Sequence, residues 1–369
     1  KSHPDKLSAV RAIGISYQMH GLVCVDDSGT PVRPSIIWCD SRAVEYGAKA
    51  FNKMGSSWCL EHLLNSPGNF TASKLKWVKE NEPQLFKSVK HFMLPGDYIA
   101  YRLTNSFTTT PSALSEGVFW DFRNEQLSKD VMDAFGFDPQ WIPEQKPVFS
   151  VHGILSKEVA RLTGLKEGTP VTYKAGDQPN NAFSLNVLNP GEMAATAGTS
   201  GVVYGVMDKV NYDPASRVNN FLHVNHRQDA KRIGVLLCVN GTGILNSWLR
   251  KNVFQGASYD NINRMAAAIS PGADQLLCYP FGNGAERILG NQEPGASFKK
   301  LNFNRHTSAH IARAAQEGIV FALKYGIEVM MEMGLSVNTV RAGHANLFLS
   351  PVFREVFASA IPCKLELYN

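Results

Sequence analysis

The chain twice places a short apolar run directly before a helical pattern, with a small polar turn between the two. The first such unit reads "GVLLCVNGTGILNSWLR" (residues 234–250), and the second reads "TVRAGHANLFLSPVFREVFASA" (residues 339–360). A strand that buries apolar side chains and a helix that follows it at once favour an α/β fold. We therefore predict an α/β protein with mixed sheets flanked by helices.

Other strands are indicated by short apolar segments that end at turn residues. We expect strands at residues 10–16 and 22–25, and a further extended piece, "SIIW", at residues 35–38. Residues 192–207 read as two apolar runs around a Gly-Thr-Ser tip, which predicts a hairpin.

Helical patterns occur in both halves of the chain. One begins after Ser41, and another covers residues 71–83, with Thr71 or Ser73 as cap and Pro83 as the stop. A short helix is predicted after Pro95. The longest pattern, residues 308–333, repeats apolar side chains at helical spacing and predicts a core helix.

The length of the chain and its apolar content predict two domains. It has 369 residues, of which 44% are hydrophobic, enough for two cores of ordinary size. A Pro-rich stretch at residues 141–147 and a helix and strand after it place the boundary close to Tyr173. The predicted domains are residues 1–173 and 174–369.

The charge and the cysteines exclude several classes of protein. The formal net charge is +5, and the 37 Lys and Arg form no block, so we expect no nucleic-acid partner. No apolar run reaches the roughly 18 residues of a membrane span. Six cysteines without a C-x-x-C pair predict reduced thiols in a cytoplasmic protein.

Asp177 is the sharpest acidic candidate. It ends an apolar strand through a glycine in "GTPVTYKAGDQPN" (residues 168–180), and ligands of open α/β sheets gather at the carboxyl ends of strands. A carboxylate there can take a proton from an attacking hydroxyl or help hold a divalent cation. A cap for a helix starting near Asn180 explains Asp177 equally well.

Two small-residue turns are candidate phosphate sites. In "AGTSG" (residues 197–201) backbone amides and hydroxyls can surround an anion, although a plain hairpin turn also accounts for the sequence. "NGTG" (residues 240–243) precedes a helix whose first amides can bind phosphate, and simple helix capping is the alternative. Neither a G-x-x-x-x-G-K-[ST] loop nor a strand-linked G-x-G-x-x-G is present.

Two other polar groups are open to a structural interpretation. Trp38, Asp40 and Arg42 can line a site, but an edge aromatic with a surface ion pair is favoured. His20 lies in "GISYQMHG", where a strand is interrupted, and by itself it is explained as a hydrogen-bonded turn residue.

The order of these motifs resembles that of the FGGY carbohydrate kinases, and within them the xylulokinases. The resemblance is carried by "GISYQMHGLVCVDDSG", "IIWCDSRA", "LPGDYIAYRLT", "AGDQPNNA", "GTSG" and "EGIVFALKYGIEVM". It implies two actin-like, ribonuclease H-like ATPase domains with a cleft between them. It further implies transfer of the γ-phosphoryl group of ATP, with Mg²⁺, to D-xylulose, giving D-xylulose 5-phosphate.

The same resemblance implies roles for individual residues. Asp177 matches the catalytic base and metal ligand, and Met19, His20 and Gln178 match the sugar-binding positions. The nucleotide-binding positions implied are Gly198, Thr199 and Ser200 in the phosphate loop and Gly343, Ala345 and Asn346 at the adenosine motif. That motif reads "AGHA" where Gly-Gly-Gly-Ala is usual, and Tyr17 stands where a glycine is common.

The resemblance also leads us to expect further chain on both sides of this sequence, including a first phosphate-loop hairpin. A homodimer is a further expectation. Two alternatives stay open: another FGGY sugar or polyol kinase, and a non-catalytic sugar or nucleotide sensor.

Overall fold

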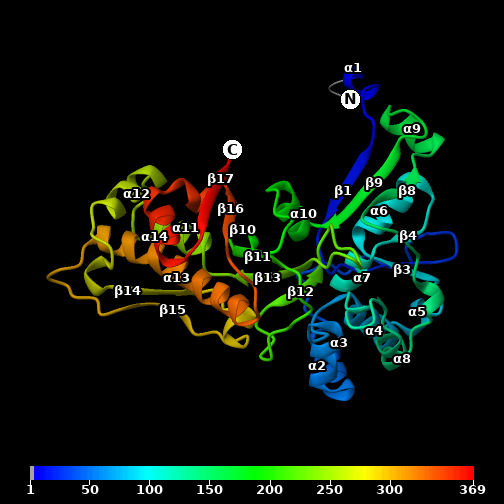
Figure 1. Cartoon of the computed structure of the whole chain (residues 1–369), viewed down its shortest axis with the longest axis horizontal. Helices are drawn as coiled ribbons and strands as arrows, with labels where there is room; N and C mark the ends of the chain where they lie inside the picture. Colours follow the sequence, from blue (N-terminus) through cyan, green and yellow to red (C-terminus); the bar gives the residue numbers. More distant parts are fainter. Residues whose placement is uncertain (1–3) are drawn as a thin grey trace. The chain divides into compact units, whose positions relative to one another are not determined.

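The computed structural model describes residues 4–369, which form two compact units (Figure 1). The first unit runs to Asn181, and residues 210–212 and 220–233 also belong to it. The second unit contains residues 182–209, 213–219 and 234–369. Both units combine strands with helices, so the predicted α/β class is confirmed.

A small sheet organises the first unit. Its strand order is β1-β9-β8, where β1 is Ile13–Tyr17, β9 is Pro170–Gly176 and β8 is Phe149–Ile154. β1 is parallel to β9, with Tyr17 paired to Gly176, and β8 is antiparallel to β9. Because parallel strands end at the same edge, the segments that follow Tyr17 and Gly176 start side by side.

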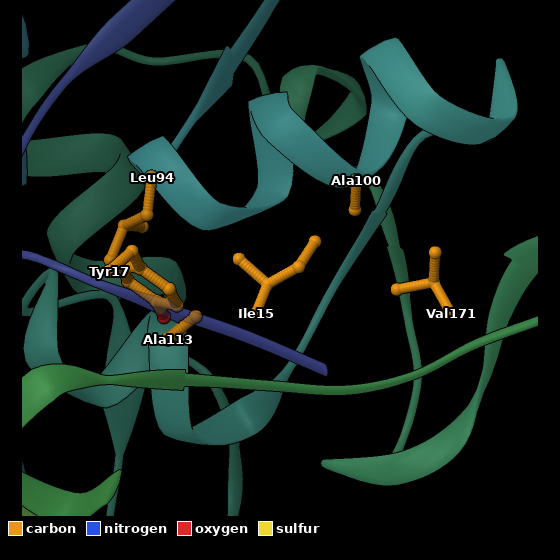
Figure 2. Packing of buried hydrophobic residues seen from close by; sticks show 6 residues of the cluster. All are labelled: Ile15, Tyr17, Leu94, Ala100, Ala113 and Val171. Atoms are coloured by element: carbon orange, nitrogen blue, oxygen red, sulfur yellow. The ribbon is translucent and has the colours of Figure 1, made fainter. Parts of the chain in front are cut away.

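Helix α6 (Pro95–Thr104) packs on this sheet and forms the core beside it. Pro95 occupies the first helical turn, where its missing N–H costs nothing. Figure 2 shows the buried cluster, in which the Tyr17 ring lies close to Leu94 and Ala113. The members of the cluster are Ile15, Tyr17, Leu94, Ala100, Ala113 and Val171.

The first unit also contains other helices and several short strands. The helices are α1 (Pro4–Leu7), α2 (Val44–Met54), α3 (Ser56–Leu63), α4 (Thr71–Asn81), α5 (Pro83–Phe86), α7 (Pro111–Glu116), α8 (Lys129–Phe135), α9 (Lys157–Thr163) and the start of α10 (Asp177–Ser184). The short strands are β2 (Val23–Val25), β3 (His91–Met93), β4 (Thr108–Thr109), β5 (Trp120–Asp121), β6 (Gln126–Leu127), β7 (Glu144–Gln145) and β12 (Asn219–Leu222).

The second unit contains a mixed sheet, as predicted. Its strands are ordered β13-β11-β10-β16-β17. β10 is antiparallel to β11 and parallel to β16, which in turn is parallel to β17. The bounds of the strands are β10 (Glu192–Ala197), β11 (Gly201–Met207), β13 (Ile233–Val239), β16 (Thr339–Gly343) and β17 (Lys364–Tyr368).

Helices and a separate hairpin complete the second unit. The hairpin predicted at residues 192–207 is confirmed as β10–β11 of the mixed sheet, and the predicted long core helix is confirmed as α13 (Ser308–Glu332). The separate hairpin is formed by β14 and β15. The other elements are α11 (Gly243–Asn252), α12 (Tyr259–Ala267), α14 (Pro351–Ala360), β14 (Leu277–Phe281) and β15 (Gly295–Lys299).

The predicted strand at residues 35–38 is wrong. Within this segment only Ile36 makes a β-bridge, to Leu22, and neither residue belongs to a strand. Ile37 and Trp38 are 45% and 60% exposed, so the segment has no second face to bury. The apolar run at residues 35–38 suggested a strand, but tertiary contacts decide whether such a run is buried in a sheet, and this one is not.

The predicted cap of the helix at residues 71–83 is also wrong. α4 begins at Thr71 itself, after Phe70, whose side chain makes no capping hydrogen bond. The helix ends at Asn81, before Pro83, which opens the next short helix, α5. Proline disfavours helical backbone at the residue before it but suits a first helical position.

Residues 4–369 hold neither a membrane-spanning helix nor a disulfide. No helix in this range combines the length and the apolar character that a bilayer span needs. The six cysteines are free thiols. Burial raises the pKa of Cys24, Cys59 and Cys278 to about 12, which keeps these three thiols protonated at neutral pH.

Candidate functional site

The first candidate site lies where β1 and β9 end. After Tyr17 the chain turns, and His20 adopts a left-handed backbone with φ of 61°. Gly21 follows, and a Cβ there would lie 2.3 Å from Gln18 Nε2 and 2.5 Å from Pro95 Cγ. A side chain at position 21 would therefore push the turn out of place, which explains the glycine.

Neighbouring residues hold the His20 ring in position. Its Nδ1 lies 2.8 Å from the backbone oxygen of Glu116, and the ring packs against Phe70 and Phe221. Because a carbonyl oxygen can only accept, Nδ1 carries the hydrogen in this contact, and neutral His20 keeps an acceptor lone pair on Nε2.

Lys74 holds the same turn through a hydrogen bond to its backbone. Its side chain is fully buried, and Nζ donates to the His20 backbone oxygen at 2.8 Å. Burial lowers the pKa of Lys74 to about 8, although Asp40 and Cys39 oppose the shift. The buried Lys74 side chain thereby fixes the backbone of His20, a candidate ligand-binding residue.

Asp177 directly follows the neighbouring strand. It begins α10 itself, so the expectation of a helix starting near Asn180 is wrong by three positions. Gln178 Nε2 donates to its carboxylate at 3.2 Å, and the backbone of Met19 donates to it as well. Asp177 is exposed, yet surrounding protein atoms remove part of its water, and this raises the pKa of the carboxyl.

Glu116 belongs to this site, and the sequence analysis did not identify it. It is the last residue of α7, a short helix opened by the cap Thr110 and by Pro111. Tyr17 Oη donates to Glu116 Oε1 at 2.6 Å, and both side chains are buried. Burial raises the pKa of Glu116 well above its usual range; the Tyr17 hydrogen bond opposes this and the Asp177 charge adds to it.

No local sequence signal points to Glu116. A glutamate near the end of a short helix is normally expected at the surface, and its hydrogen bond to Tyr17 joins residues 99 positions apart. The same contact accounts for Tyr17, which the resemblance left without a role.

Trp38, Asp40 and Arg42 lie on the surface of the first unit. Arg42 Nη2 and Asp40 Oδ2 form an exposed ion pair at 2.7 Å, in line with the favoured interpretation. The Trp38 backbone N–H donates to Gln18 Oε1 at 2.9 Å. This bond ties the segment to the residue before Met19.

The second candidate site is a cavity of about 380 Å³ in the second unit. It lies at the tip of the β10–β11 hairpin, beside the starts of α11 and α12 and a short 3-10 helix after β16. Amide and hydroxyl side chains dominate its polar lining. The lining residues are Ala197, Gly198, Thr199, Gly243, Asn246, Ser247, Tyr259, Asp260, Asn263, Asn346, Leu347, Leu349 and Ser350.

The "NGTG" turn and the first residue after it hydrogen-bond to the tip of the β10–β11 hairpin. The backbone N–H groups of Gly243 and Ile244 donate to the Gly198 and Thr199 oxygens at 2.8 and 3.1 Å. Thr242 Oγ1 donates to the Gly198 oxygen at 3.1 Å. These first amides of α11 are occupied by the hairpin carbonyls and not by a phosphate, and Thr242, the N-cap residue, makes no side-chain capping hydrogen bond.

The predicted nucleotide residues are only partly brought together. Gly198, Thr199 and Asn346 line the cavity, whereas Ser200, Gly343 and Ala345 are not among its lining residues. Sequence reasoning missed Asn246, Tyr259 and Asn263 because polar residues in α11 and α12 are typical of any exposed helix face. Ala342 is fully buried and pairs with Ala195, so its methyl group packs in the core.

Among residues 4–369 no group of three or more His, Cys, Asp or Glu side chains is placed to hold a metal ion. Mg²⁺ usually takes one or two carboxylates together with substrate phosphates, so a lone carboxylate such as Asp177 suits an ion that a nucleotide carries.

The chain is similar to known proteins along most of its length. Residues 3–184 match the N-terminal domain of the FGGY family of carbohydrate kinases, and residues 193–369 match the C-terminal domain of that family. The xylulose kinase of Staphylococcus epidermidis is 31% identical over 339 residues, which are 91% of this chain and 66% of that protein. The Bacillus subtilis gluconokinase is 24% identical and covers 88% of this chain, which spans 64% of its length.

The fold is also similar to that of a solved xylulose kinase. The crystal structure of xylulose kinase from Rhodospirillum rubrum superposes with a TM-score of 0.87 at 24% identity, over 97% of this chain and 72% of that one. The two domain matches together cover nearly the whole sequence in the order that the motifs predicted. The chain belongs to the FGGY family of carbohydrate kinases.

Proposed function

We propose that this protein transfers the γ-phosphoryl group of ATP to D-xylulose, giving D-xylulose 5-phosphate and ADP. The observation that carries the proposal is the parallel pairing of β1 with β9, which brings the Met19 backbone to Asp177, with His20 directly after Met19. The likeness to xylulose kinases supports the choice of substrate.

Asp177 acts as the general base. Its carboxylate takes the proton of the sugar 5-hydroxyl as that oxygen bonds to the γ-phosphorus, the bond to the bridging oxygen of ADP breaks, and Asp177 later returns the proton to water. The raised pKa of Asp177 makes it a stronger base than an ordinary aspartate. Its hydrogen bond from Gln178 keeps the carboxylate oriented.

Met19, His20 and Gln178 bind the sugar. His20 Nε2 accepts from a sugar hydroxyl, because the Glu116 oxygen holds the hydrogen on Nδ1. Met19 supplies an apolar contact, and its backbone position is tied to Asp177.

The cavity of the second unit receives the nucleotide. Gly198 and Thr199 lie at the hairpin tip and suit the phosphates, while Asn346 suits the adenosine end. Ser200, Gly343 and Ala345 do not line this cavity, and the family likeness alone supports them as further nucleotide contacts. Asp177 is the proposed protein ligand of Mg²⁺, and the ion supplies charge neutralisation on the phosphate oxygens when it is bound.

Another FGGY sugar kinase activity is the second candidate, because the chain is also similar to a gluconokinase. ADP release measured with a panel of D-xylulose, other ketoses, gluconate and glycerol separates the two. A preference for any other acceptor would overturn the xylulose proposal.

Asp177→Asn tests the proposed general base. The substitution should lower kcat by about 10²–10⁴-fold while sugar binding persists, and undiminished turnover would exclude the base role.

A further inference from the structure

We propose that Glu116 is a further sugar-binding residue, whose carboxyl Oε2 exchanges a hydrogen bond with a hydroxyl of the bound sugar and thereby sets specificity. This inference rests on the proposed sugar kinase function. It assigns a role to a side chain that no motif of the sequence indicated.

The first observation is an unpartnered oxygen on Glu116. The residue is 2% exposed, its Oε1 accepts from Tyr17, and its Oε2 is buried without a hydrogen-bond partner. None of the ion pairs found among residues 4–369 includes this carboxyl. A buried polar atom left unpaired costs free energy, and a ligand group that supplies the missing bond recovers it.

The second observation is the place of that oxygen. A Cβ built on Gly176 would lie 2.7 Å from Glu116 Oε2 and 2.6 Å from Met19 Cγ. Glu116 Oε2 and Met19 therefore crowd against the residue that precedes Asp177. Met19 Sδ lies 3.3 Å from the same built Cβ, so the flexible thioether and the Glu116 carboxyl share this corner of the site.

Glu116 also contacts the site through its backbone. Its carbonyl oxygen binds His20 Nδ1 at 2.8 Å. One residue at the end of α7 thus touches His20 with its main chain and the Met19–Gly176 corner with its side chain. The same short helix positions both contacts, so they are geometrically linked.

The neighbouring groups define the chemistry of the partner. The Tyr17 hydroxyl from β1, the Asp97 carboxyl from α6 and the Asp177 carboxyl at the start of α10 act on Glu116, while His20 meets its carbonyl. Acidic neighbours disfavour an anionic partner such as phosphate. A neutral hydroxyl, which can donate and accept, fits this environment.

Such a contact discriminates strongly between substrates. A site that hydrogen-bonds a substrate hydroxyl rejects the analogue that lacks it, because the buried protein group is then left unpaired. We therefore expect the loss of one particular non-reacting hydroxyl of D-xylulose to weaken binding far more than the loss of the others.

The test compares Glu116→Leu, Glu116→Gln and Tyr17→Phe with the unmodified chain. D-xylulose and its monodeoxy analogues are titrated calorimetrically, and kcat and KM are measured with ATP. We expect Glu116→Leu to weaken D-xylulose binding about 10- to 100-fold and to raise KM more than it lowers kcat. Glu116→Gln keeps a donor and an acceptor and should stay within about threefold.

The selectivity among the deoxy analogues separates ligand contact from packing. In Glu116→Leu the one sensitive analogue should bind as well as D-xylulose, whereas a merely structural residue leaves the order of the analogues unchanged. Calorimetric ATP binding and thermal unfolding serve as folding controls, and Tyr17→Phe should weaken binding in the same direction as Glu116→Leu, but less.

The outcomes distinguish this inference from the function on which it rests. Equal sugar binding by the unmodified chain and Glu116→Leu overturns the role of Glu116 alone. Loss of binding in Glu116→Gln as severe as in Glu116→Leu, with intact ATP binding, also overturns the hydroxyl contact. If the unmodified chain binds no sugar while it binds ATP, the proposed function fails, and the inference fails with it.

Discussion

At the scale of single residues, His20 combines backbone strain with several holding contacts. A non-glycine residue at φ of 61° is uncommon and costs free energy. Lys74 and Glu116 hold its carbonyl and its ring nitrogen, and Phe70 and Phe221 flank the ring. Strain that neighbours maintain in this way is typical of residues that bind ligands.

Asp177 predicts a pH dependence at the same scale. Its pKa is raised above 3.8, so the carboxyl loses its basic form at a higher pH than an ordinary aspartate does. We expect kcat/KM for the sugar to fall as the pH decreases through this raised pKa. A pH profile with ADP release as the readout checks the limb, and full activity at pH 4 would contradict it.

At the scale of elements, β9 is anchored by a buried ion pair three residues before Asp177. Lys174 Nζ lies 2.6 Å from Asp97 Oδ1 in α6, and both side chains are 1% exposed. Lys174 Nζ also donates to the Thr108 backbone oxygen at 2.7 Å. Lys174 therefore joins β9 to α6 and to Thr108 close in sequence to Asp177.

Lys174→Met tests this anchor. The substitution leaves the Asp97 carboxylate buried without its cation, and we expect a loss of about 3–5 kcal/mol in the free energy of unfolding. Urea unfolding followed by circular dichroism measures it. The double variant Lys174→Met/Asp97→Leu removes both charges and should recover much of the loss; failure to do so would point to packing as the cause.

The contact between the hairpin tip and α11 leads to another prediction. A Cβ on Gly243 would lie 2.2 Å from the Gly198 oxygen, so Gly243→Ala must push the tip away. Overpacking of this kind costs about 1–3 kcal/mol. We expect weaker ATP binding by calorimetry with unchanged sugar binding, and Gly256→Ala, at an open position with nothing within 4 Å, serves as a strained but uncrowded control.

At the scale of the whole molecule, Lys74 links stability to pH. Its pKa is about 8 in the folded protein and 10.5 as the ordinary value, so between these values the unfolded chain binds more protons. The Lys74 contribution to stability therefore rises as the pH increases from about 8 to 10.5. The buried thiols act oppositely above pH 9, because folding raises their pKa.

Comparison with Lys74→Met isolates this contribution, since the thiols are common to both proteins. The free energy of unfolding of the unmodified chain relative to Lys74→Met should increase between pH 8 and 10 in urea titrations. A difference that stays constant over this range would show that Lys74 has no depressed pKa.

Much of the fold was predictable because its signals are local. The hairpin at residues 192–207, the helix α13 and the strand that ends before Asp177 follow from apolar periodicity and turn residues. The ordered motifs were enough to indicate the family, which the domain matches confirm. The assumed strand at residues 35–38 failed because exposure, which is not local, decided its structure.

The sequence by itself determined the order of strands and helices, the α/β class and the family, because side-chain period and turn chemistry act over a few residues. Only the tertiary structure decided that β1 lies parallel to β9 with Tyr17 opposite Gly176, and that Glu116 lies against both. Those contacts join residues that lie far apart in the sequence, and no pattern of short range can encode which distant side chain completes a buried hydrogen bond.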